Sequence, residues 1–148
     1  MTESNAGATR FATPMLIRFA HCDPAGIVYF PQYLTLFNGV VEDWFNQALQ
    51  ISYSRLITVD RVGLPIVRLE CDFQAVSPLG DTVELGLSVV KLGTRSITLR
   101  IDCLGPDGQL RVSCEKVLVF MNLATHQSIP APPHVRLAIE RFMRGSKD

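Results

Sequence analysis

The sequence lacks an excess of either charge. Fourteen lysine and arginine residues balance fourteen aspartate and glutamate residues, so the formal net charge is zero. Proteins that bind nucleic acid usually carry a basic excess, and this balance argues against a nucleic-acid partner. Neutrality still leaves room for an acidic ligand that is held by a few local cations.

Long apolar runs and paired cysteine motifs are also missing. No run approaches the roughly 18 apolar residues that cross a bilayer, and Met1–Arg10 has no apolar signal-peptide core. The four cysteines form no C-x-x-C pair and have no metal-like spacing to histidine, so no metal site is predicted. Three of them stand in strand-like runs, which favours reduced, buried thiols. We therefore expect a cytoplasmic setting and no membrane partner.

The chain has enough length and apolar content for one folded domain. It contains 148 residues, of which 47% are hydrophobic and 8% aromatic. This composition is typical of a globular protein that buries a sizeable core. We expect a flexible N-terminal segment over residues 1–12 and a single domain over residues 13–148.

One long amphipathic helix is predicted from Pro31 to about Gln50. Proline is favoured in the first turn of a helix. Apolar residues recur at helical spacing and form one broad stripe, made of Tyr33, Leu36, Phe37, Val40, Trp44 and Ala48. The opposite side is polar and carries Thr35, Asn38, Glu42 and Asn46. A shorter helix is expected over Val135–Met143.

Five strands are predicted besides these helices, and they cover Met15–Ala20, Val67–Phe73, Val83–Val89, Ile97–Cys103 and Leu110–Met121. In the last strand the alternation breaks across Glu115-Lys116, which a β-bulge would explain. Turn-rich segments separate the later strands at hairpin distances. We therefore expect an α+β fold, in which one antiparallel sheet with hairpin succession covers the long helix.

A turn-rich tract places the Asp23 carboxylate a few residues before the long helix. The first backbone N–H groups of a helix lack internal partners and carry positive dipole character. Phe30, at the helix start, offers no capping oxygen, so an amide there can stay free for a ligand carbonyl. Asp23 and this amide could act on one carbonyl from two sides. The structural alternative is that Asp23 only forms a turn, because Asp-Pro is a common turn starter.

The segment Asp23–Tyr33 reads D-P-A-G-I-V-Y-F-P-Q-Y. It closely resembles the signature of the 4-hydroxybenzoyl-CoA thioesterase family, D-P-A-G-[IV]-V-[YW]-x-x-x-Y, and a weaker likeness extends through Leu64–Val67 and the later strands. The resemblance implies the hotdog fold, a curved five-stranded antiparallel sheet wrapped around one long central helix. It also implies a homodimer or homotetramer with active sites at the subunit interface.

The same resemblance implies an acyl-CoA thioesterase that acts on an aromatic or short acyl group. It makes Asp23 the nucleophile or general base, and it makes the Phe30 backbone amide the group that polarises the carbonyl. Lys91 and Arg95 flank a hairpin and match basic residues that contact coenzyme A phosphates. Asn38 would meet the acyl group, but the 4-hydroxybenzoyl enzymes have an acidic residue there, which puts that substrate in doubt. No cofactor is implied beyond the coenzyme A that the substrate carries.

Several alternatives stay open. His21 would face the same way as Asp23 in an extended segment, whereas Cys22 would face the other way and is not expected to form a Cys–His pair. Asp43, and less favourably Glu42, could supply a carboxylate from the helix. A hotdog hydratase or dehydratase would need an Asp–His pair. A non-catalytic hotdog protein would only bind an acyl thioester or a partner.

Overall fold

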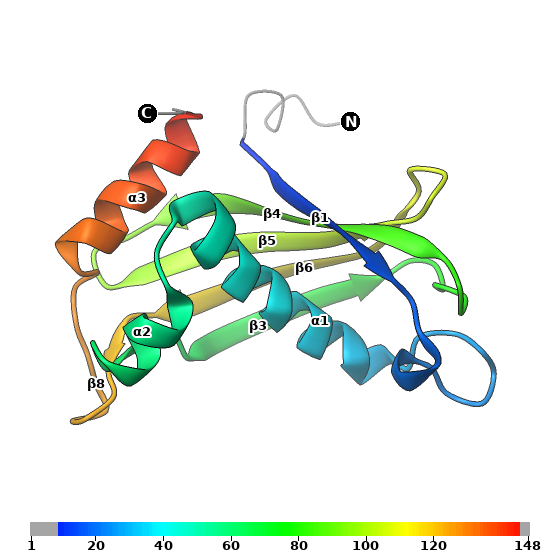
Figure 1. The fold of residues 1–148 in the computed structure, drawn as a ribbon, viewed down its shortest axis with the longest axis horizontal. Helices are drawn as coiled ribbons and strands as arrows, with labels where there is room; N and C mark the ends of the chain where they lie inside the picture. Colours follow the sequence, from blue (N-terminus) through cyan, green and yellow to red (C-terminus); the bar gives the residue numbers. More distant parts are fainter. Residues whose placement is uncertain (1–8, 146–148) are drawn as a thin grey trace.

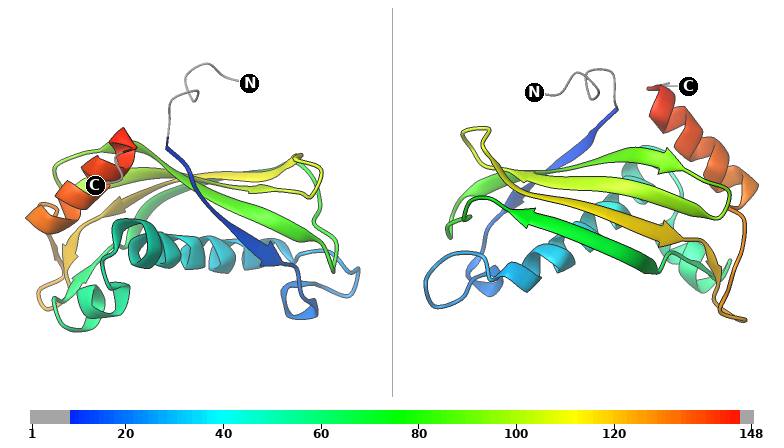
Figure 2. Two further views of the ribbon diagram at one scale, coloured as in Figure 1. Left: turned by 45° about the horizontal axis from the view of Figure 1, so that its top comes forward. Right: turned by 180° about the vertical axis from the view of Figure 1, so that it is seen from behind.

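The computed structural model of the chain describes residues 9–145 and shows a five-stranded sheet packed on one long helix (Figure 1). Neighbouring strands are antiparallel, in the order β1-β4-β5-β6-β3. The strands are β1 (Phe11–Leu16), β3 (Ile66–Phe73), β4 (Thr82–Leu92), β5 (Ser96–Leu104) and β6 (Leu110–Val119). The sheet curves over the helix without closing (Figure 2). The predicted α+β hotdog arrangement is confirmed.

The central helix α1 (Phe30–Asp43) has proline in its first turn, as its sequence predicts. It continues without a break into six π-helical residues, η3 (Trp44–Leu49), and ends at Gln50 in the left-handed conformation (φ 56°). The predicted extent is therefore confirmed, although its last six residues are wound more widely than an α-helix. Five of the six stripe residues are buried, and Ala48 is exposed.

The core lies between this helix and the concave face of the sheet. Phe37 and Phe45 are fully buried against alternate residues of the central strands β4 and β5, such as Leu85 and Ile101. Removing a ring of this kind costs about 3–5 kcal/mol, so these contacts fix the helix on the sheet.

The predicted strand Met15–Ala20 is wrong in position. β1 covers residues 11–16, and Phe19–His21 forms a 3₁₀ turn instead. Pro14 lies inside β1, which is possible because β1 is an edge strand and proline lacks only the backbone donor. Of the predicted N-terminal segment 1–12, residues 1–8 lie outside the described part of the chain, and residues 11–12 belong to β1.

The predicted hairpin succession of four strands is also wrong at its first step. β3 pairs with β6 rather than with β4, and the segment 74–81 leads from the β3 edge to β4, the neighbour of β1. The β4–β5 and β5–β6 hairpins are confirmed. The local turn signal in Pro78–Asp81 is real, but a turn does not determine which strands pair.

The register of β6 is regular where a bulge is predicted. Glu115 pairs with Glu70 and Arg100, and Lys116 pairs with the next residues of the same two strands, Leu69 and Leu99. The predicted bulge is therefore wrong. The alternation breaks because a lysine occupies an inward-facing position.

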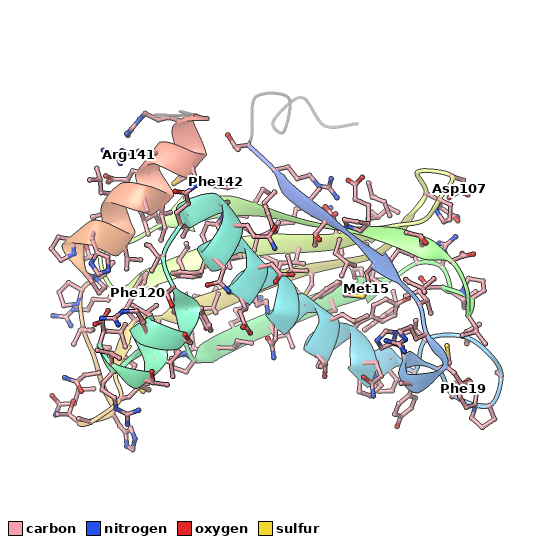
Figure 3. All side chains as sticks on the ribbon, viewed as in Figure 1. Met15, Phe19, Asp107, Phe120, Arg141 and Phe142 are labelled. Carbon is pink, nitrogen blue, oxygen red and sulfur yellow. The ribbon has the colours of Figure 1, made fainter. Side chains whose placement is uncertain are left out.

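Smaller elements complete the chain at one end of the sheet. They are α2 (Tyr53–Thr58), β2 (Val62–Gly63), β7 (Met121–Asn122), β8 (Gln127–Ser128) and α3 (Pro133–Arg144). The last of these confirms the predicted short helix. Its Phe142, labelled in Figure 3, packs edge-on against Trp44, and the ring centroids are 5.4 Å apart. Within residues 9–145, no helix combines the length and apolarity needed to cross a membrane.

Candidate active site

Asp23 begins a tight turn just before α1. Its carbonyl oxygen accepts a hydrogen bond from the Gly26 amide at 3.0 Å, and its Oδ1 accepts one from the Ala25 amide at 2.8 Å. Gly26 has φ +80°, a conformation that favours glycine. The turn-forming interpretation of Asp23 is confirmed. The side chain is half-buried, and its Oδ2 has no hydrogen-bond donor among residues 9–145.

The start of α1 is uncapped. Tyr29 precedes the helix in an extended conformation, and no side chain accepts a hydrogen bond from the first helical amides. Within the part of the chain that the structure describes, the Phe30 amide has no acceptor. An unpaired amide at a helix N-terminus can donate to a substrate carbonyl or to an oxyanion.

Aromatic rings surround this helix start. The Phe30 side chain is 59% exposed, and its ring meets Phe73 of β3 edge-on at 6.0 Å. Tyr33, one turn further, is buried and donates a hydrogen bond to Ser77 Oγ at 2.9 Å. The Val28 amide donates to the Ser77 carbonyl oxygen, so the tract and the helix are both fixed to the segment 74–81. Burial raises the pKa of the Tyr33 hydroxyl, which suits an anchor rather than a base.

The two predicted phosphate-binding residues lie far from Asp23 within one chain. The Asp23 loop contacts the segment before β4, where the Leu79 amide donates to the Gly26 carbonyl oxygen. Lys91 stands nine residues beyond the start of β4, about 30 Å along the strand. Figure 1 shows the β4–β5 turn and the loop before α1 at opposite ends of the sheet. Lys91 is exposed, and Arg95 donates to the Ser128 carbonyl oxygen at 2.9 Å.

Asn38 lies between these ends and lines a cavity of about 610 Å³. Helix α1 forms one wall, and the residues before and at the start of β3 form another, with Glu42, Pro65 and Ile66 among the lining residues. This volume lies in the range of small-molecule sites. Asp23 is not one of the residues that line it.

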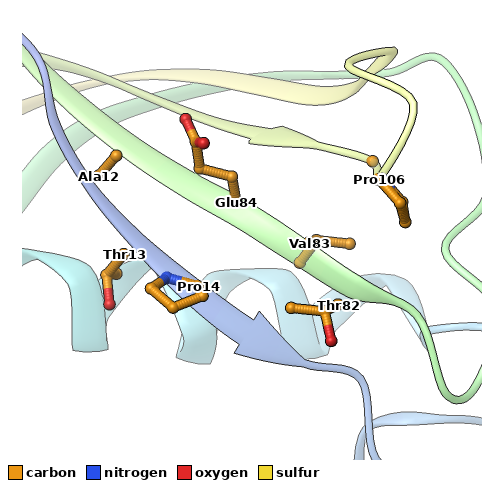
Figure 4. Close-up of a pocket in the computed structure, with 8 residues that line it drawn as sticks. Ala12, Thr13, Pro14, Thr82, Val83, Glu84 and Pro106 are labelled. Carbon is orange, nitrogen blue, oxygen red and sulfur yellow. The ribbon is translucent and has the colours of Figure 1, made fainter.

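A second hollow, of about 310 Å³, lies between β1, β4 and the β5–β6 turn (Figure 4). Its ionisable residue is Glu84, which forms an ion pair with Arg10. Because this carboxylate already has a partner, the larger cavity beside Asn38 is the better candidate for a binding site.

The structure separates the other candidate residues from Asp23. His21 Nδ1 accepts a hydrogen bond from the Arg18 amide at 3.0 Å, and the Cys22 thiol donates to the Arg18 carbonyl oxygen at 3.4 Å. Both are used in local structure, and no Asp23–His21 hydrogen bond is present among the described residues. Of the two helix carboxylates, Glu42 is one of the residues that line the cavity and Asp43 is not.

The sheet exposes one edge that carries many apolar side chains. On β3, the edge strand beside β6, Ile66, Val67, Leu69 and Phe73 are each 41–60% exposed. The opposite edge strand, β1, contains a proline, which blunts pairing with another chain. The β3 edge has exposed apolar side chains and no proline, so it is suited to pairing with a strand of another chain.

Sequence analysis did not identify Lys116 as a site residue. Its ammonium nitrogen lies 3.3 Å from Asn38 Oδ1, although the side chain is only 2% exposed. The single signal in the sequence is the break in alternation that also suggested a bulge. All four cysteines are free thiols, and the Cys71 and Cys114 sulfurs lie 2.8 Å apart on paired strands. Within residues 9–145, no cluster of three or more acidic, histidine or cysteine side chains could hold a metal ion.

Comparison with known proteins places this geometry in a family. Residues 17–139 match the model of the thioesterase-like superfamily. A 1,4-dihydroxy-2-naphthoyl-CoA hydrolase from Synechococcus elongatus is 32% identical over 124 residues, which cover 82% of this chain and 88% of that protein. The hydrolase of the same name from Synechocystis is 31% identical over 75 residues, which cover 51% of this chain and 54% of that protein.

Solved structures show the same fold. A gentisyl-coenzyme A thioesterase superposes with a TM-score of 0.79 at 26% identity and covers 87% of this chain and 99% of its own. The 4-hydroxybenzoyl-CoA thioesterase of a Pseudomonas species superposes with a TM-score of 0.78 at 22% identity, covering 88% and 99%. At this identity the latter likeness concerns the fold alone.

Proposed function

This chain is a thioester hydrolase of the thioesterase-like superfamily, and from that premise we propose that it hydrolyses an acyl-CoA with Asp23 as the reacting carboxylate. The acyl group is aromatic or short. Two observations seven residues apart in the sequence carry the proposal. Asp23 is half-buried with its Oδ2 unpaired among residues 9–145, and the Phe30 amide at the start of α1 is uncapped. Coenzyme A is part of the substrate, and the proposed reaction needs no other cofactor.

In the proposed reaction the thioester carbonyl oxygen accepts a hydrogen bond from the Phe30 amide. Each donor aimed at an oxyanion contributes about 10²–10³ in rate, so the helix start supplies a major part of the catalysis. Asp23 then attacks the carbonyl carbon, the coenzyme A thiolate leaves, and water opens the mixed anhydride. Alternatively, Asp23 removes a proton from the water that attacks. The turn around Asp23 supports both routes, because it fixes one carboxylate oxygen and leaves the other without a donor among the described residues.

The proposed active unit contains two copies of the chain. Phe30 contacts Phe73 at the end of β3, whereas the cavity beside Asn38 is lined by Ile66 at its start. In a two-fold antiparallel pair of β3 strands, the end of one strand lies opposite the start of the other. The pairing would place the Asp23 loop of one copy beside the cavity of its partner. A homotetramer would join two such dimers.

This pairing also accounts for the separation of Asp23 from Lys91. Within one chain the loop before α1 and the β4–β5 turn lie at opposite ends of the sheet, but an antiparallel partner would bring its β4–β5 hairpin toward the Asp23 loop. Lys91 and Arg95 then supply cations for the coenzyme A phosphates, which carry concentrated negative charge. Four free thiols in the described chain favour a reducing, cytoplasmic site of action.

The experiment that tests the function measures free thiol release from a panel of aromatic, short-chain and long-chain acyl-CoAs. We expect turnover of aromatic or short esters and a weaker reaction with long chains. Loss of the double bond of an enoyl-CoA without thiol release would instead indicate a hydratase. Tight acyl-CoA binding without any turnover would indicate a non-catalytic binding protein, and either result would overturn the proposal.

A further inference from the structure

Lys116 is a buried lysine in the middle of the sheet. It lies on β6 in regular register between Leu69 of β3 and Leu99 of β5, on the concave face. Its side chain is 2% exposed, and its neighbours on the same face of β6, Cys114 and Leu118, are buried as well. Lysine is almost never fully buried unless its charge is paired.

This lysine has no carboxylate partner among residues 9–145. Its single hydrogen bond goes from Nζ to Asn38 Oδ1 at 3.3 Å. The other titratable groups that face it are the thiols of Cys71 and Cys114, and burial lowers the pKa of the Lys116 ammonium. An ammonium has three donors, so this position leaves two of them unused. A buried, poorly paired polar group costs stability, which makes a purely structural role a poor explanation.

The ammonium determines how Asn38 is oriented. Lysine is a donor only, so the group that faces it must be the carbonyl oxygen of the Asn38 amide. The NH₂ group of Asn38 is therefore turned away from Lys116. Asn38 lines the cavity on α1, and its NH₂ group has no acceptor among the described residues. The two N–H donors of the Asn38 amide are thus available to a ligand in the cavity, and the Lys116 ammonium lies on the carbonyl side of the same amide.

The charge of the cavity limits what these donors can bind. Glu42 lies one turn after Asn38 and lines the same cavity. A carboxylate at this position disfavours an anionic ligand group, because like charges repel. Apart from the hydroxyl groups of Thr35 and Tyr53, the other lining side chains offer apolar surface; they are Val41, Leu64, Pro65, Ile66 and Leu118. A neutral oxygen acceptor on an otherwise apolar group meets these conditions.

We propose that Lys116 is a positioning residue that fixes the orientation of the Asn38 amide. The Asn38 NH₂ group then selects acyl groups that carry a neutral hydrogen-bond-accepting oxygen at the end remote from the thioester. This inference rests on the proposed function, because it takes the cavity as the acyl site. Asn38 is eight residues, or about 12 Å, from Phe30 along α1. That length exceeds a benzoyl group, so the acyl end reaches Asn38 across the β3 edge, from the Asp23 loop of the other copy.

The test compares two acyl-CoAs of the same shape, 4-acetylbenzoyl-CoA and 4-isopropenylbenzoyl-CoA, which differ in an oxygen acceptor. Dissociation constants are measured with Asp23→Asn protein, so that neither ester is consumed. One neutral hydrogen bond corresponds to about tenfold tighter binding of the acetyl ester. Adding Lys116→Met, which removes the terminal ammonium and keeps an unbranched side chain one atom shorter, should reduce this preference to about twofold or less. Binding of the isopropenyl ester should stay unchanged.

Three further variants make the outcome specific. Asn38→Ala should lose the same preference, and combining it with Lys116→Met should cause no additional loss. Asn38→Asp pairs directly with the ammonium and has no NH₂ group, so it should also lose the preference for the acetyl ester. This variant keeps Lys116 and therefore tests the inference even if Lys116→Met does not fold. Lys91→Ala should weaken both esters equally, because it acts at the coenzyme A end.

The results separate this inference from the proposed function. A preference that is absent in the parent protein, or that survives Lys116→Met, overturns the inference even if thiol release is rapid. Failure to bind either ester overturns it too. A Lys116-dependent preference in a protein whose Asp23 form releases no thiol supports the inference and overturns the proposed hydrolysis.

Discussion

The start and the middle of helix α1, which the proposed acyl site joins across two copies, differ in how their polar groups are held. At the N-terminal end, Asp23 lies half-buried in a surface turn, and the Phe30 amide is unpaired among the described residues. Eight residues further on, Asn38 is fixed by an almost fully buried lysine. The start of the helix offers reactive groups near solvent, whereas the middle offers orientation at a cost in stability. From this comparison we expect that catalysis at the start and acyl selection at the middle can be changed separately.

Removing the charge of Asp23 should have the largest effect. Asp23→Asn keeps an oxygen that can accept from the Ala25 amide, so the turn is preserved while the nucleophile or base is lost. We expect kcat to fall by at least about 10²-fold with the fold intact. Asp107→Asn is the matched control, because Asp107 accepts from the Gln109 amide at 3.0 Å in a similar turn. Steady-state thiol release and circular dichroism measure both variants, and equal rates for the two would contradict the role of Asp23.

Disrupting the β3 edge should have the next largest effect. Val67 is 60% exposed on this strand, and Val67→Asp places a charge where a second copy is expected to pair. We expect monomers in sedimentation velocity and a loss of about tenfold or more in kcat/KM, because the proposed site needs residues of both copies. Leu137→Asp, on the exposed face of α3, serves as a control that leaves the dimer intact. A fully active monomer would show that each site lies within one chain.

The coenzyme A end should give a smaller change, confined to binding. Lys91→Ala removes an exposed cation that makes no hydrogen bond among residues 9–145. We expect KM for acyl-CoA to rise by about three- to tenfold, with no change for the matching pantetheine thioester, which lacks the nucleotide phosphates. The readout is the ratio of the two KM values. A parallel rise for both substrates would rule out phosphate contact.

The smallest change expected is a gain in stability from Lys116→Met. Burial lowers the Lys116 pKa below its ordinary value of 10.5, so the unfolded chain binds more protons between the folded pKa and 10.5. The cost of burying the charge is fully present below the folded pKa and disappears as the pH rises toward 10.5. We expect the variant to be more stable by on the order of 1 kcal/mol at pH 7, with the gap closing at high pH. Urea unfolding at several pH values measures this, and destabilisation at neutral pH would indicate a structural role.

Much of the N-terminal half of the site could be predicted from the sequence, because its signals are local. The D-P-A-G tract specifies its own turn through an Asp at the first position, a Pro at the second and Gly26 at the left-handed position. The spacing of Tyr33, Phe37 and Val40 specifies which face of α1 is buried. Each of these features depends on residues a few positions apart.

Non-local features could not be predicted in the same way. β3 pairs with β6 across more than forty residues (Cys71 with Cys114), and nothing in a turn signal encodes this choice. Pro14 argues against a strand over residues 11–16 in the sequence, because proline is accepted in a strand only when that strand lies at the edge of a sheet. The break in alternation at Glu115-Lys116 is interpreted as a bulge in the sequence, because lysine normally avoids the core. The inward position of Lys116 depends on the register of two neighbouring strands, which only the folded chain determines.

Subunit complementation tests the central claim most directly, namely that each site joins the Asp23 loop of one copy to the cavity of the other. Asp23→Asn removes the carboxylate, and Asn38→Trp fills the cavity. If the sites are shared, a mixed dimer has one site that carries both substitutions and one site that carries neither. After equal mixing and subunit exchange about half of the dimers are mixed, so about a quarter of the wild-type activity should return. If each site lay within a single chain, every site would keep one defect, and the mixture would stay as inactive as the two separate variants.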